Sequence, residues 1–348
     1  MRTCHPRAYL LFFVSTFVFI NNTCGQGNYK PVPLPPKISS VNEEFSGMTI
    51  WKNRAYLVPQ YGSHKETKLN GDFFIYSLLC DSISRVIDGK DAGLSFYQSI
   101  RVNNLQQLPD SVKEYYEGFE AIEIVNGTVF LSIETNDIYD YCFLLKGKLD
   151  LLKHEINIDP LHFITLKRYP YIENAGFESV TYLPKENKLI AMYEFNGMPT
   201  GGIGFLIDTS FKKPVQKISV PFLYFRITDI KATKDDQLYG INYYWYGDYN
   251  SYLNNNILRH AEENIKISIP DLKDNLDTDP GFLKKNTCYA RIVSLKNYRD
   301  AKWKQVASFE CDKNNWEGLA LFRNGALVIT DANRNSKQAT TFAFVSFK

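Results

Sequence analysis

Short apolar segments with a period of two recur along the chain and predict β-strands. Five units share one layout: a strand, a tight turn carrying Asn, Asp or Lys, and a second strand that ends in a polar residue. The units are 45–60, 118–134, 176–194, 227–242 and 316–331. Further strand-like runs follow the first three units. Four short antiparallel strands repeated about an axis form the blades of a β-propeller, so the pattern predicts five four-stranded blades.

The fifth unit predicts how the ring closes. It has three strands, ending at 341–347, where the chain stops. We therefore expect the N-terminal segment 36–40 to pair with 341–347 and complete the last blade. A six-bladed ring is the alternative, because residues 247–286 interrupt the fourth unit before its third strand. This insertion either holds a degenerate blade or covers one mouth of the tunnel that runs along the axis of the propeller.

Composition agrees with an all-β fold. The chain contains 23 Tyr and 24 Phe but only 4 Met, and its apolar runs are short and rich in residues that strands prefer. No stretch of useful length shows the helical period of 3.6 residues. We therefore expect a single propeller domain over residues 27–348.

The N-terminus predicts export. Arg2 and Arg7 precede an apolar run over 8–20, and small polar residues follow it. As a helix this run would rise about 20 Å, short of the roughly 30 Å hydrocarbon core of a membrane. Residues 1–26 therefore predict a signal peptide, and the mature protein is expected in the extracellular space or periplasm. Lipid attachment at Cys24 is the alternative to ordinary cleavage.

Charge makes nucleic acid an improbable partner. The chain has 40 Lys and Arg against 38 Asp and Glu, and removal of residues 1–26 takes away two basic residues, which leaves 38 of each. A nucleic-acid binder normally carries a basic excess or a basic run. No second apolar stretch is long enough to span a membrane. We expect a monomer that binds a small molecule, a phosphoester or a glycan.

Four cysteines lie in the expected mature chain: Cys80, Cys142, Cys288 and Cys311. Two strand-like runs, 288–295 and 303–309, flank turn residues, and folding this hairpin brings Cys288 opposite Cys311. An exported protein allows the two to form a disulfide. Two buried free thiols are an equal alternative, because directly paired strand positions do not always suit disulfide geometry.

The repeat matters for function because symmetric blades direct corresponding residues toward one axis. The first strands supply a column of Ser46, Glu120, Glu178, Asp229 and Glu317. The second strands supply a column of Gln60, Glu134, Glu194, Asn242 and Asp331. Seven of these ten positions are carboxylates and none is basic, although strand interiors disfavour Asp and Glu. We therefore expect a functional ring of acids around the tunnel.

Such a ring predicts a bound cation. Two ionised carboxylates ~6 Å apart repel each other by about 3 kcal/mol at an effective dielectric constant near 20. The ring must therefore raise its pKa values or hold a cation. A set of oxygen ligands without Cys or His favours Ca²⁺. We assign the metal to Glu120, Glu178, Asp229 and Glu317, and a water-filled acidic tunnel is the alternative.

Four short motifs carry a resemblance to known families. Gly-Phe-Glu-Ala at 118–121, Gly-Phe-Glu-Ser at 176–179, Ile-Thr-Asp-Ile at 227–230 and Trp-Glu-Gly-Leu-Ala at 316–320 resemble blade starts of the SdiA-regulated and phytase-like (esterase-like activity of phytase) secreted propellers. The similarity spans roughly residues 36–348. It implies tunnel-bound Ca²⁺ and, for some members, phosphoesterase activity. The Asp-Asp-Pro pattern of alkaline propeller phytases is absent, which argues against phytate as the substrate.

Three functions are compatible with this sequence. The first is a Ca²⁺-dependent phosphoester or ester hydrolase. Its catalytic carboxylates would be Glu134, Glu194 and Asp331, and its ligand-binding residues Arg226, Asn242, Tyr246 and Arg334. The second is a hydrolase of the sugar-lactonase type. The third is a module that binds glycans or peptides without chemistry, through the aromatic segment 243–252.

Overall fold

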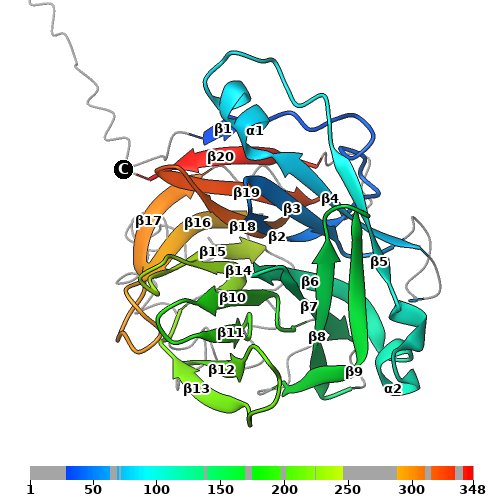
Figure 1. Ribbon diagram of the computed structural model, residues 1–348. Helices are drawn as coiled ribbons and strands as arrows, with labels where there is room; N and C mark the ends of the chain where they lie inside the picture. The colour runs from blue at the N-terminus through cyan, green and yellow to red at the C-terminus, as the bar shows by residue number, and fades with distance from the viewer. Residues whose placement is uncertain are drawn as a thin grey trace, which may run out of the picture.

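The structure, a computed structural model, describes residues 29–62, 69, 72–136, 139–168, 175–196, 201–223, 225–245, 288–309, 315–333 and 340–347. It is a β-propeller with five blades of four antiparallel strands (Figure 1). The five-bladed architecture expected from the sequence is confirmed. In each blade the first strand lies beside the first strands of the neighbouring blades, so β2, β6, β10, β14 and β18 form the inner ring.

The strands follow the repeat in chain order. Blade 1 contains β2 (Phe45–Trp51), β3 (Arg54–Pro59), β4 (Phe73–Leu79) and β5 (Gln98–Asn103). Blade 2 contains β6 (Tyr116–Val125), β7 (Thr128–Thr135), β8 (Tyr141–Asp150) and β9 (Glu155–Lys167). Blade 3 contains β10 (Ser179–Leu183), β11 (Lys188–Met192), β12 (Gly202–Asp208) and β13 (Gln216–Val220). Blade 4 contains β14 (Arg226–Ala232), β15 (Leu238–Trp245), β16 (Cys288–Leu295) and β17 (Lys304–Phe309). Blade 5 contains β18 (Asn315–Phe322), β19 (Gly325–Asp331), β20 (Phe342–Ser346) and the N-terminal β1 (Tyr29–Pro31).

The N-terminal strand closes the ring, as expected, but the segment assigned to it was wrong. Tyr29 pairs with Val345, and the N–H of Val32 donates to the carbonyl of Phe342. Residues 36–40 instead form turns, in which the N–H of Ile38 donates to the carbonyl of Pro35. The proline-rich approach to Ile38 favours a turn over a ladder strand, because proline lacks the N–H that a strand needs.

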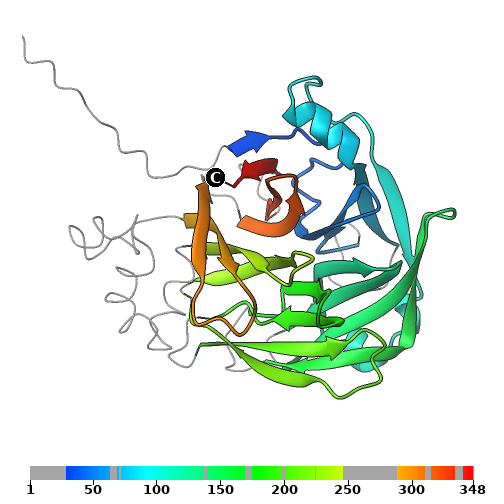
Figure 2. The same ribbon diagram turned by 60° about the vertical axis from the view of Figure 1, so that its left-hand side comes forward.

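The expectation of no helix was also wrong for one segment. Helix α1 (Cys80–Ile87) follows β4, and its buried residues Cys80, Ile83, Val86 and Ile87 lie on one face. This face packs against the blade 5 core, and α1 lies on the outside of the ring near β1 and β20 (Figures 1 and 2). The connection from blade 1 to blade 2 adds a 3₁₀ turn, η1 (Leu105–Gln107), and the short helix α2 (Asp110–Lys113).

Apolar side chains between adjacent blades form the core. Each face of a blade presents alternate residues to its neighbour, as in β19 (Gly325–Asp331), which is buried along its whole length. Within the described residues, no helix is long and apolar enough to cross a membrane. Residues 1–26, with the expected signal peptide, and the whole 247–286 insertion lie outside the described residues.

The cysteine hairpin agrees with the expected pairing as far as it is described. Strands β16 and β17 pair from Ser294–Lys304 up to Ala290–Phe309. Cys311 and the side chain of Cys288 lie outside the described residues, so their disulfide stays a prediction. Cys80 and Cys142 are buried free thiols.

Candidate active site

Two features of the blades bring acidic side chains to one end of the propeller. In blades 1, 2, 4 and 5 a residue of the inner strand bulges out of the ladder, and the second strand ends opposite it; in blade 3 the ladder is regular and Glu178 directly precedes β10. The bulge residues include Ser46, Glu120 and Glu317, each set between two paired neighbours. Because paired strands are antiparallel, the start of each first strand and the end of each second strand meet at the same end of the blade.

Blade 4 departs from this alignment by one residue. Its bulge falls on Thr228, between the pairs Ile227–Asn242 and Asp229–Ile241. The Thr228 hydroxyl donates to the carbonyl of Trp316, just as the bulged Ser46 hydroxyl donates to Phe119 in blade 2. Thr228 thus occupies the position that Glu120 and Glu317 hold in their blades. Asp229 lies one residue further along and belongs to a different cluster.

Glycines in the Gly-Phe-Glu motifs make room for polar side chains of the preceding blade. A Cβ at Gly118 would overlap Cγ of Gln60 in blade 1. A Cβ at Gly176 would lie 3.0 Å from Oε1 of Glu134 in blade 2. Each glycine therefore faces a polar side chain at the C-terminal end of the second strand of the previous blade.

Arg226 takes the corresponding place in blade 4, two residues before the bulge. Its Nη1 lies 2.7 Å from Oε2 of Glu194, which follows the second strand of the previous blade. The other Glu194 oxygen, Oε1, accepts a 2.7 Å hydrogen bond from the N–H of Gly176. Both groups are buried, with 0% of Glu194 and 8% of Arg226 exposed. Glu194 is therefore in direct contact with a guanidinium, which favours the ionised form of a carboxyl group.

Six carboxyl groups and Arg226 form what we call the acid cluster. Its acids are Glu120, Glu134, Glu178, Glu194, Glu317 and Asp331. Five of the six are buried and Glu317 is half-buried. The structure therefore brings together all three predicted catalytic acids, three of the four predicted metal ligands and one predicted ligand-binding residue.

Burial and mutual repulsion raise the pKa values of four of these acids. Burial, followed by the nearby Glu194 carboxylate, raises the pKa of Glu134 to about 8. The pKa of Glu178 is raised well above its ordinary value, first by burial and then by Glu194 and Glu317. Burial also raises the pKa of Glu120 and of Glu317, with Glu134 and Asp331 as the next largest causes. Glu134 therefore keeps its proton at neutral pH.

Two oxygens of the acid cluster have no hydrogen-bond partner in the part of the chain that the structure describes. They are Oε1 of Glu134 and Oε2 of Glu178, and both are buried. The remaining acids use at least one local partner: Gln60 Nε2 donates to Glu120 Oε1 at 3.0 Å, and the N–H of Asn333 donates to Asp331 Oδ1 at 2.7 Å. Buried polar atoms are rarely left unpaired, so the two orphaned oxygens mark where a ligand can bind.

Arg168 is a buried residue that no sequence motif marks as part of a functional site. Its charge lowers the pKa of Glu134, opposing the effect of burial. Its Nη2 donates to the hydroxyl of Thr135 at 3.0 Å and its Nε to the sulfur of Cys142 at 3.3 Å. Arg168 therefore fixes the end of β7, directly beside Glu134. It lies in no repeated motif, and no pattern in the sequence distinguishes it from a surface arginine.

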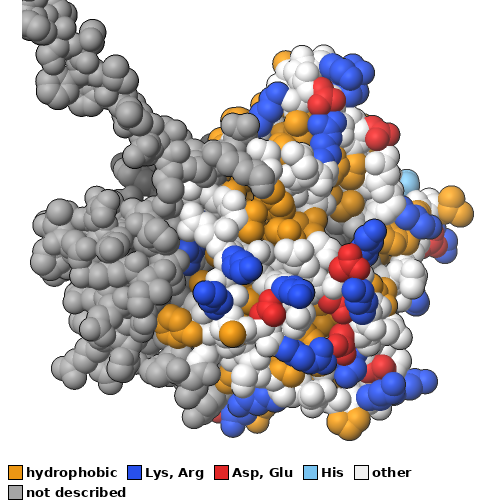
Figure 3. Space-filling model, turned by 90° about the vertical axis from the view of Figure 1, so that its left-hand side faces the viewer, with side chains coloured by type: hydrophobic (Ala, Val, Ile, Leu, Met, Phe, Trp, Pro, Cys, Tyr) orange, Lys and Arg blue, Asp and Glu red, His pale blue; other side chains and the backbone are white. Residues whose placement is uncertain are grey.

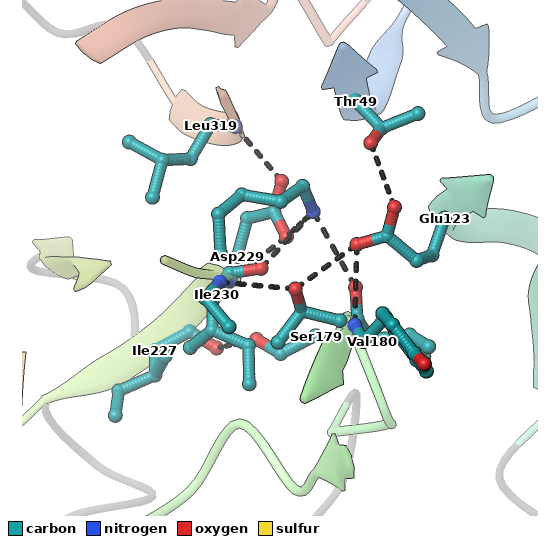
Figure 4. Close-up of polar contacts among 12 residues, drawn as sticks. Thr49, Glu123, Ser179, Val180, Ile227, Asp229, Ile230 and Leu319 are labelled. Atoms are coloured by element: carbon teal, nitrogen blue, oxygen red, sulfur yellow. Dashed lines mark hydrogen bonds and ion pairs between the residues drawn. The ribbon is translucent and has the colours of Figure 1, made fainter. Parts of the chain in front are cut away.

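A second polar cluster lies further along the same inner strands, and we call it the clasp. It consists of Thr49, Glu123, Thr181, Asp229 and Lys231 (Figure 4). Glu123 accepts hydrogen bonds from the hydroxyls of Thr49 at 3.0 Å and Thr181 at 2.9 Å. These bonds join blades 1, 2 and 3.

The other half of the clasp joins blades 3, 4 and 5. Lys231 Nζ lies 2.7 Å from Asp229 Oδ1 and also donates to the carbonyls of Ile230 and Val180. The N–H of Leu319 in β18 donates to Asp229 Oδ2 at 2.8 Å (Figure 4). Burial raises the pKa of Asp229 to about 7, and Lys231 opposes that rise. The oxygens of Asp229 are thus occupied by groups of the protein.

The remaining sequence-predicted residues lie elsewhere. Asn242 is fully buried within blade 4, where its amide donates to the carbonyl of Arg226 at 2.9 Å and accepts from Arg291 Nε at 2.7 Å. Tyr246 and Arg334 lie outside the described residues. On the outer surface, by contrast, charges of both signs are interspersed over the described part of the face in Figure 3. The concentration of one sign is a property of the acid cluster.

The donor chemistry of the acid cluster suits Ca²⁺, but its arrangement does not. The donors are oxygens only, which is the ligand type that Ca²⁺ takes. Among the described residues, however, no group of three or more His, Cys, Asp or Glu side chains is arranged to hold a metal ion. Ion binding at Glu120, Glu178 and Glu317 would require these side chains to turn toward a common point.

Several solved structures resemble this chain in fold. One is a GH43 β-xylosidase/α-arabinofuranosidase from a compost microbial metagenome, with 8% identity, a TM-score of 0.46, and coverage of 92% of this chain and 94% of that one. The GH43_1 enzyme from Xanthomonas citri has 7% identity, a TM-score of 0.48, and coverage of 92% and 90%. An aldose sugar dehydrogenase from Streptomyces coelicolor has 7% identity, a TM-score of 0.41, and coverage of 93% and 99%.

At these identities the likeness concerns the β-propeller fold alone. No protein-family model matches the sequence, and no curated protein matches it. Membership of the SdiA-regulated or phytase-like families therefore stays a prediction.

Proposed function

We propose that the protein is a hydrolase that cleaves glycosidic bonds by general acid–base catalysis in the acid cluster. The observation that carries this proposal is a pair of acids in different surroundings. Glu194 contacts the guanidinium of Arg226, which favours its ionised form, whereas burial raises the pKa of Glu134 to about 8 and leaves its Oε1 without a partner among the described residues. Pairs of acids whose surroundings separate their pKa values provide an acid and a base at one pH.

The chemistry of the cluster selects the type of bond. An acetal needs a proton on its leaving oxygen, which a protonated carboxyl supplies, and a base that activates water, which a carboxylate supplies. Six carboxyl groups disfavour an anionic phosphoester, because Arg226 is already paired with Glu194. No histidine, the usual partner of a nucleophilic serine or cysteine, occurs among the described residues of the cluster. A neutral acetal is therefore the bond that these residues suit best.

In the proposed reaction Glu134 gives its proton to the leaving oxygen as the glycosidic C–O bond breaks. Glu194 takes a proton from the attacking water, whose oxygen forms the new bond to the sugar carbon. The products are a sugar and an alcohol, with Glu134 ionised and Glu194 protonated. A proton exchange through solvent then restores the starting state. Arg226 and the N–H of Gly176 orient Glu194 in both states.

Stacked tyrosines beside the acid cluster support a ring-shaped ligand. The rings of Tyr115 and Tyr139 are parallel within 8° and 4.3 Å apart, and Tyr141 lies 5.6 Å from Tyr139. All three are half-buried. The N–H of Asn136, two residues after Glu134, donates to the carbonyl of Tyr115, which places the stack at the acid-cluster end of blade 2. Aromatic faces suit the apolar face of a sugar ring.

The test uses leaving groups of different acidity. Wild type is assayed against a panel of 4-nitrophenyl glycosides and against the matching oligosaccharides. We expect Glu134→Gln to lower kcat by about 10² to 10⁴ on oligosaccharides but much less on 4-nitrophenyl glycosides, because a good leaving group needs no proton. Glu194→Ala should lose activity on both and regain part of it with azide.

The matched control is Glu155→Gln, on the outer strand β9, which should keep wild-type rates. Absence of hydrolysis by wild type on every glycoside of the panel would exclude this function. Equal losses for Glu134→Gln on both kinds of leaving group would exclude Glu134 as the acid.

Calcium binding at the acid cluster, with the hydrolase activity expected from the sequence, is the second candidate. The two orphaned oxygens of Glu134 and Glu178 favour it, and the arrangement of the carboxyl groups does not. We assign no reaction step to the ion. If Ca²⁺ binds the folded state, a hundredfold excess over Kd raises the unfolding free energy by about 2.7 kcal/mol. Melting in chelator and in millimolar Ca²⁺ should then differ for wild type but not for the Glu120→Gln, Glu178→Gln double variant.

A further inference from the structure

The outer strands of blades 1 and 2 join in a way that the other described sheets lack. Strand β5 pairs in parallel with β9, from Arg101–Glu155 to Asn103–Asn157, and merges the two blades into one eight-stranded sheet. In the remaining sheets the outer strands β13, β17 and β1 stand at the edge. The parallel pairing ends at Asn103, where Asn104 adopts a positive φ of 70° and the chain turns into η1.

This junction encloses a hollow of about 290 Å³. Its walls carry five amide side chains, and we call it the amide hollow: Asn103, Asn104, Gln106, Gln107 and Asn157. The hollow lies on the outer edge of the propeller, among outer-strand residues, whereas the acid cluster is built on the inner strands.

Hydrogen bonds within the hollow orient its amides. Asn103 Nδ2 donates to Asn157 Oδ1 at 3.1 Å, and Asn104 Nδ2 donates to the carbonyl of Ile158 at 3.0 Å. Gln107 Nε2 reaches Asn104 Oδ1 at 3.4 Å. Among the described residues, the Oδ1 of Asn103 and the Nδ2 hydrogens of Asn157 have no protein partner, so the wall of the hollow keeps one amide acceptor and one amide donor for a ligand.

The hollow is electrically neutral. Among the described residues that line it, only Arg101 and Asp72 are charged, and their Nη2 and Oδ1 atoms lie 2.5 Å apart in an ion pair. A phosphate or a polyamine would find no uncompensated charge there. Adjacent hydroxyl groups, each of which both donates and accepts, match paired amide donors and acceptors. The volume of the hollow is close to the lower end of the range for small-molecule binding sites.

We propose that the amide hollow binds a neutral, polyhydroxylated ligand, namely a unit of an oligosaccharide. This inference goes beyond the proposed catalytic function, because the hollow needs no chemistry and shares no residue with the acid cluster. A protein with both sites would hold one part of a glycan at its edge while another part reaches the acid cluster.

The experiment measures binding of xylohexaose, cellohexaose, maltohexaose and mannohexaose by isothermal titration and by NMR chemical-shift changes. The catalytically impaired Glu134→Gln variant serves as the parent, so that no probe is consumed. We expect one probe to bind, and its affinity to fall at least tenfold in Asn103→Ala, Asn157→Ala. The more conservative Asn103→Asp, Asn157→Asp pair should weaken binding as well, because it removes the donors and adds charge at nearly constant volume.

The matched control is Gln216→Ala, an exposed amide on the outer strand β13, which should bind as the parent does. Circular dichroism and melting confirm that each variant is folded. If no probe binds the parent, or if both double variants bind it equally well, the proposal is wrong. Hydrolysis is scored separately on Asn103→Ala, Asn157→Ala with 4-nitrophenyl glycosides, so loss of the hollow and loss of the acid cluster give different results.

Discussion

The acid cluster and the clasp use the same inner strands but show opposite chemistry. On β6, Glu120 belongs to the acid cluster and Glu123, three residues later, belongs to the clasp. Glu123 accepts hydrogen bonds from two neighbouring blades, and Asp229 has Lys231 as a counter-ion. Glu134 and Glu178 keep buried oxygens without partners. Polar groups that are fully paired fix a structure, whereas those left unpaired are available to a ligand.

This difference predicts that removing an acid destabilises the protein when the acid belongs to the clasp and stabilises it when the acid belongs to the acid cluster. The largest effect is expected for Asp229→Ala, which leaves the buried ammonium of Lys231 without its counter-ion. Breaking a buried pair from one side costs about 3–5 kcal/mol. Chemical denaturation at pH 8, where Asp229 is ionised, measures the change. The Asp229→Ala, Lys231→Met double variant should recover much of the loss.

Glu134→Gln is the contrasting variant, since it removes a repelled acid and keeps its volume. It should be at least as stable as wild type at pH 8. If Glu134→Gln and Asp229→Ala lowered stability equally, the distinction between the two regions would fail.

The pH dependence of stability is a further test of the acid cluster, to which the clasp contributes with the same sign because the pKa of Asp229 is also raised. The folded pKa of Glu134, about 8, lies above its ordinary value of 4.5, so the folded state binds more protons between these values. Its contribution is complete below pH 4.5 and is lost as the pH rises through 8. The loss is on the order of 2–4 kcal/mol.

Wild type should therefore melt at a lower temperature at pH 9 than at pH 5, and Glu134→Gln should show a smaller decrease. Asp229, with a folded pKa of about 7, retains part of the slope in that variant. Glu155→Gln is the control and should follow wild type. A wild-type melting temperature that rises steadily from pH 5 to pH 9 would contradict the raised pKa values.

A smaller effect is expected at Arg226, whose Nη1 lies 2.7 Å from Oε2 of Glu194. Arg226→Met should destabilise the protein by about 2 kcal/mol at pH 8 and by less at pH 5, because the stranded Glu194 can take up a proton. Glu194→Gln should offset most of this loss. The double-mutant cycle gives the coupling energy directly. A coupling energy near zero would show that Arg226 does not hold Glu194 in its ionised form.

The repeat was sufficient to predict the ring and most of the acid cluster. Glu120, Glu178 and Glu317 follow the same aromatic position in their blades, and symmetry alone brings them together. Asp229 could not be placed this way, because the chemical likeness of Asp to Glu suggested an alignment that the bulge at Thr228 shifts by one residue. The hydroxyl at Thr228, matching Ser46 of blade 1, was the signal that could have corrected it.

Features that differ from blade to blade could not be predicted from the repeat. Arg226 occupies the position of Gly118 and Gly176, and comparing the three blades at that position would have placed it against Glu194. The clasp joins residues that occur in only one or two blades, so no column contains it. Closure by Tyr29–Pro31 depends on a three-residue strand, which is too short to show alternation.

The smallest expected effect tests how much the hydrogen bonds from each blade contribute to the stability of the clasp. Thr49→Val keeps shape and removes one hydroxyl, which donates to Glu123 Oε1 at 3.0 Å. Glu123 then still has the hydroxyl of Thr181 and the N–H groups of Ile124 and Tyr182. A single neutral-to-charged hydrogen bond contributes about 1.5–3 kcal/mol, and the three remaining donors should reduce the loss to about 1 kcal/mol.

Thr181→Val should cost more, because its hydroxyl also accepts from the N–H of Ala232 and so joins blade 4 to the network. Denaturation of the two variants under one set of conditions measures the difference. If Thr49→Val cost more than Thr181→Val, Glu123 would depend chiefly on blade 1, and Thr181 would not be the centre of the clasp.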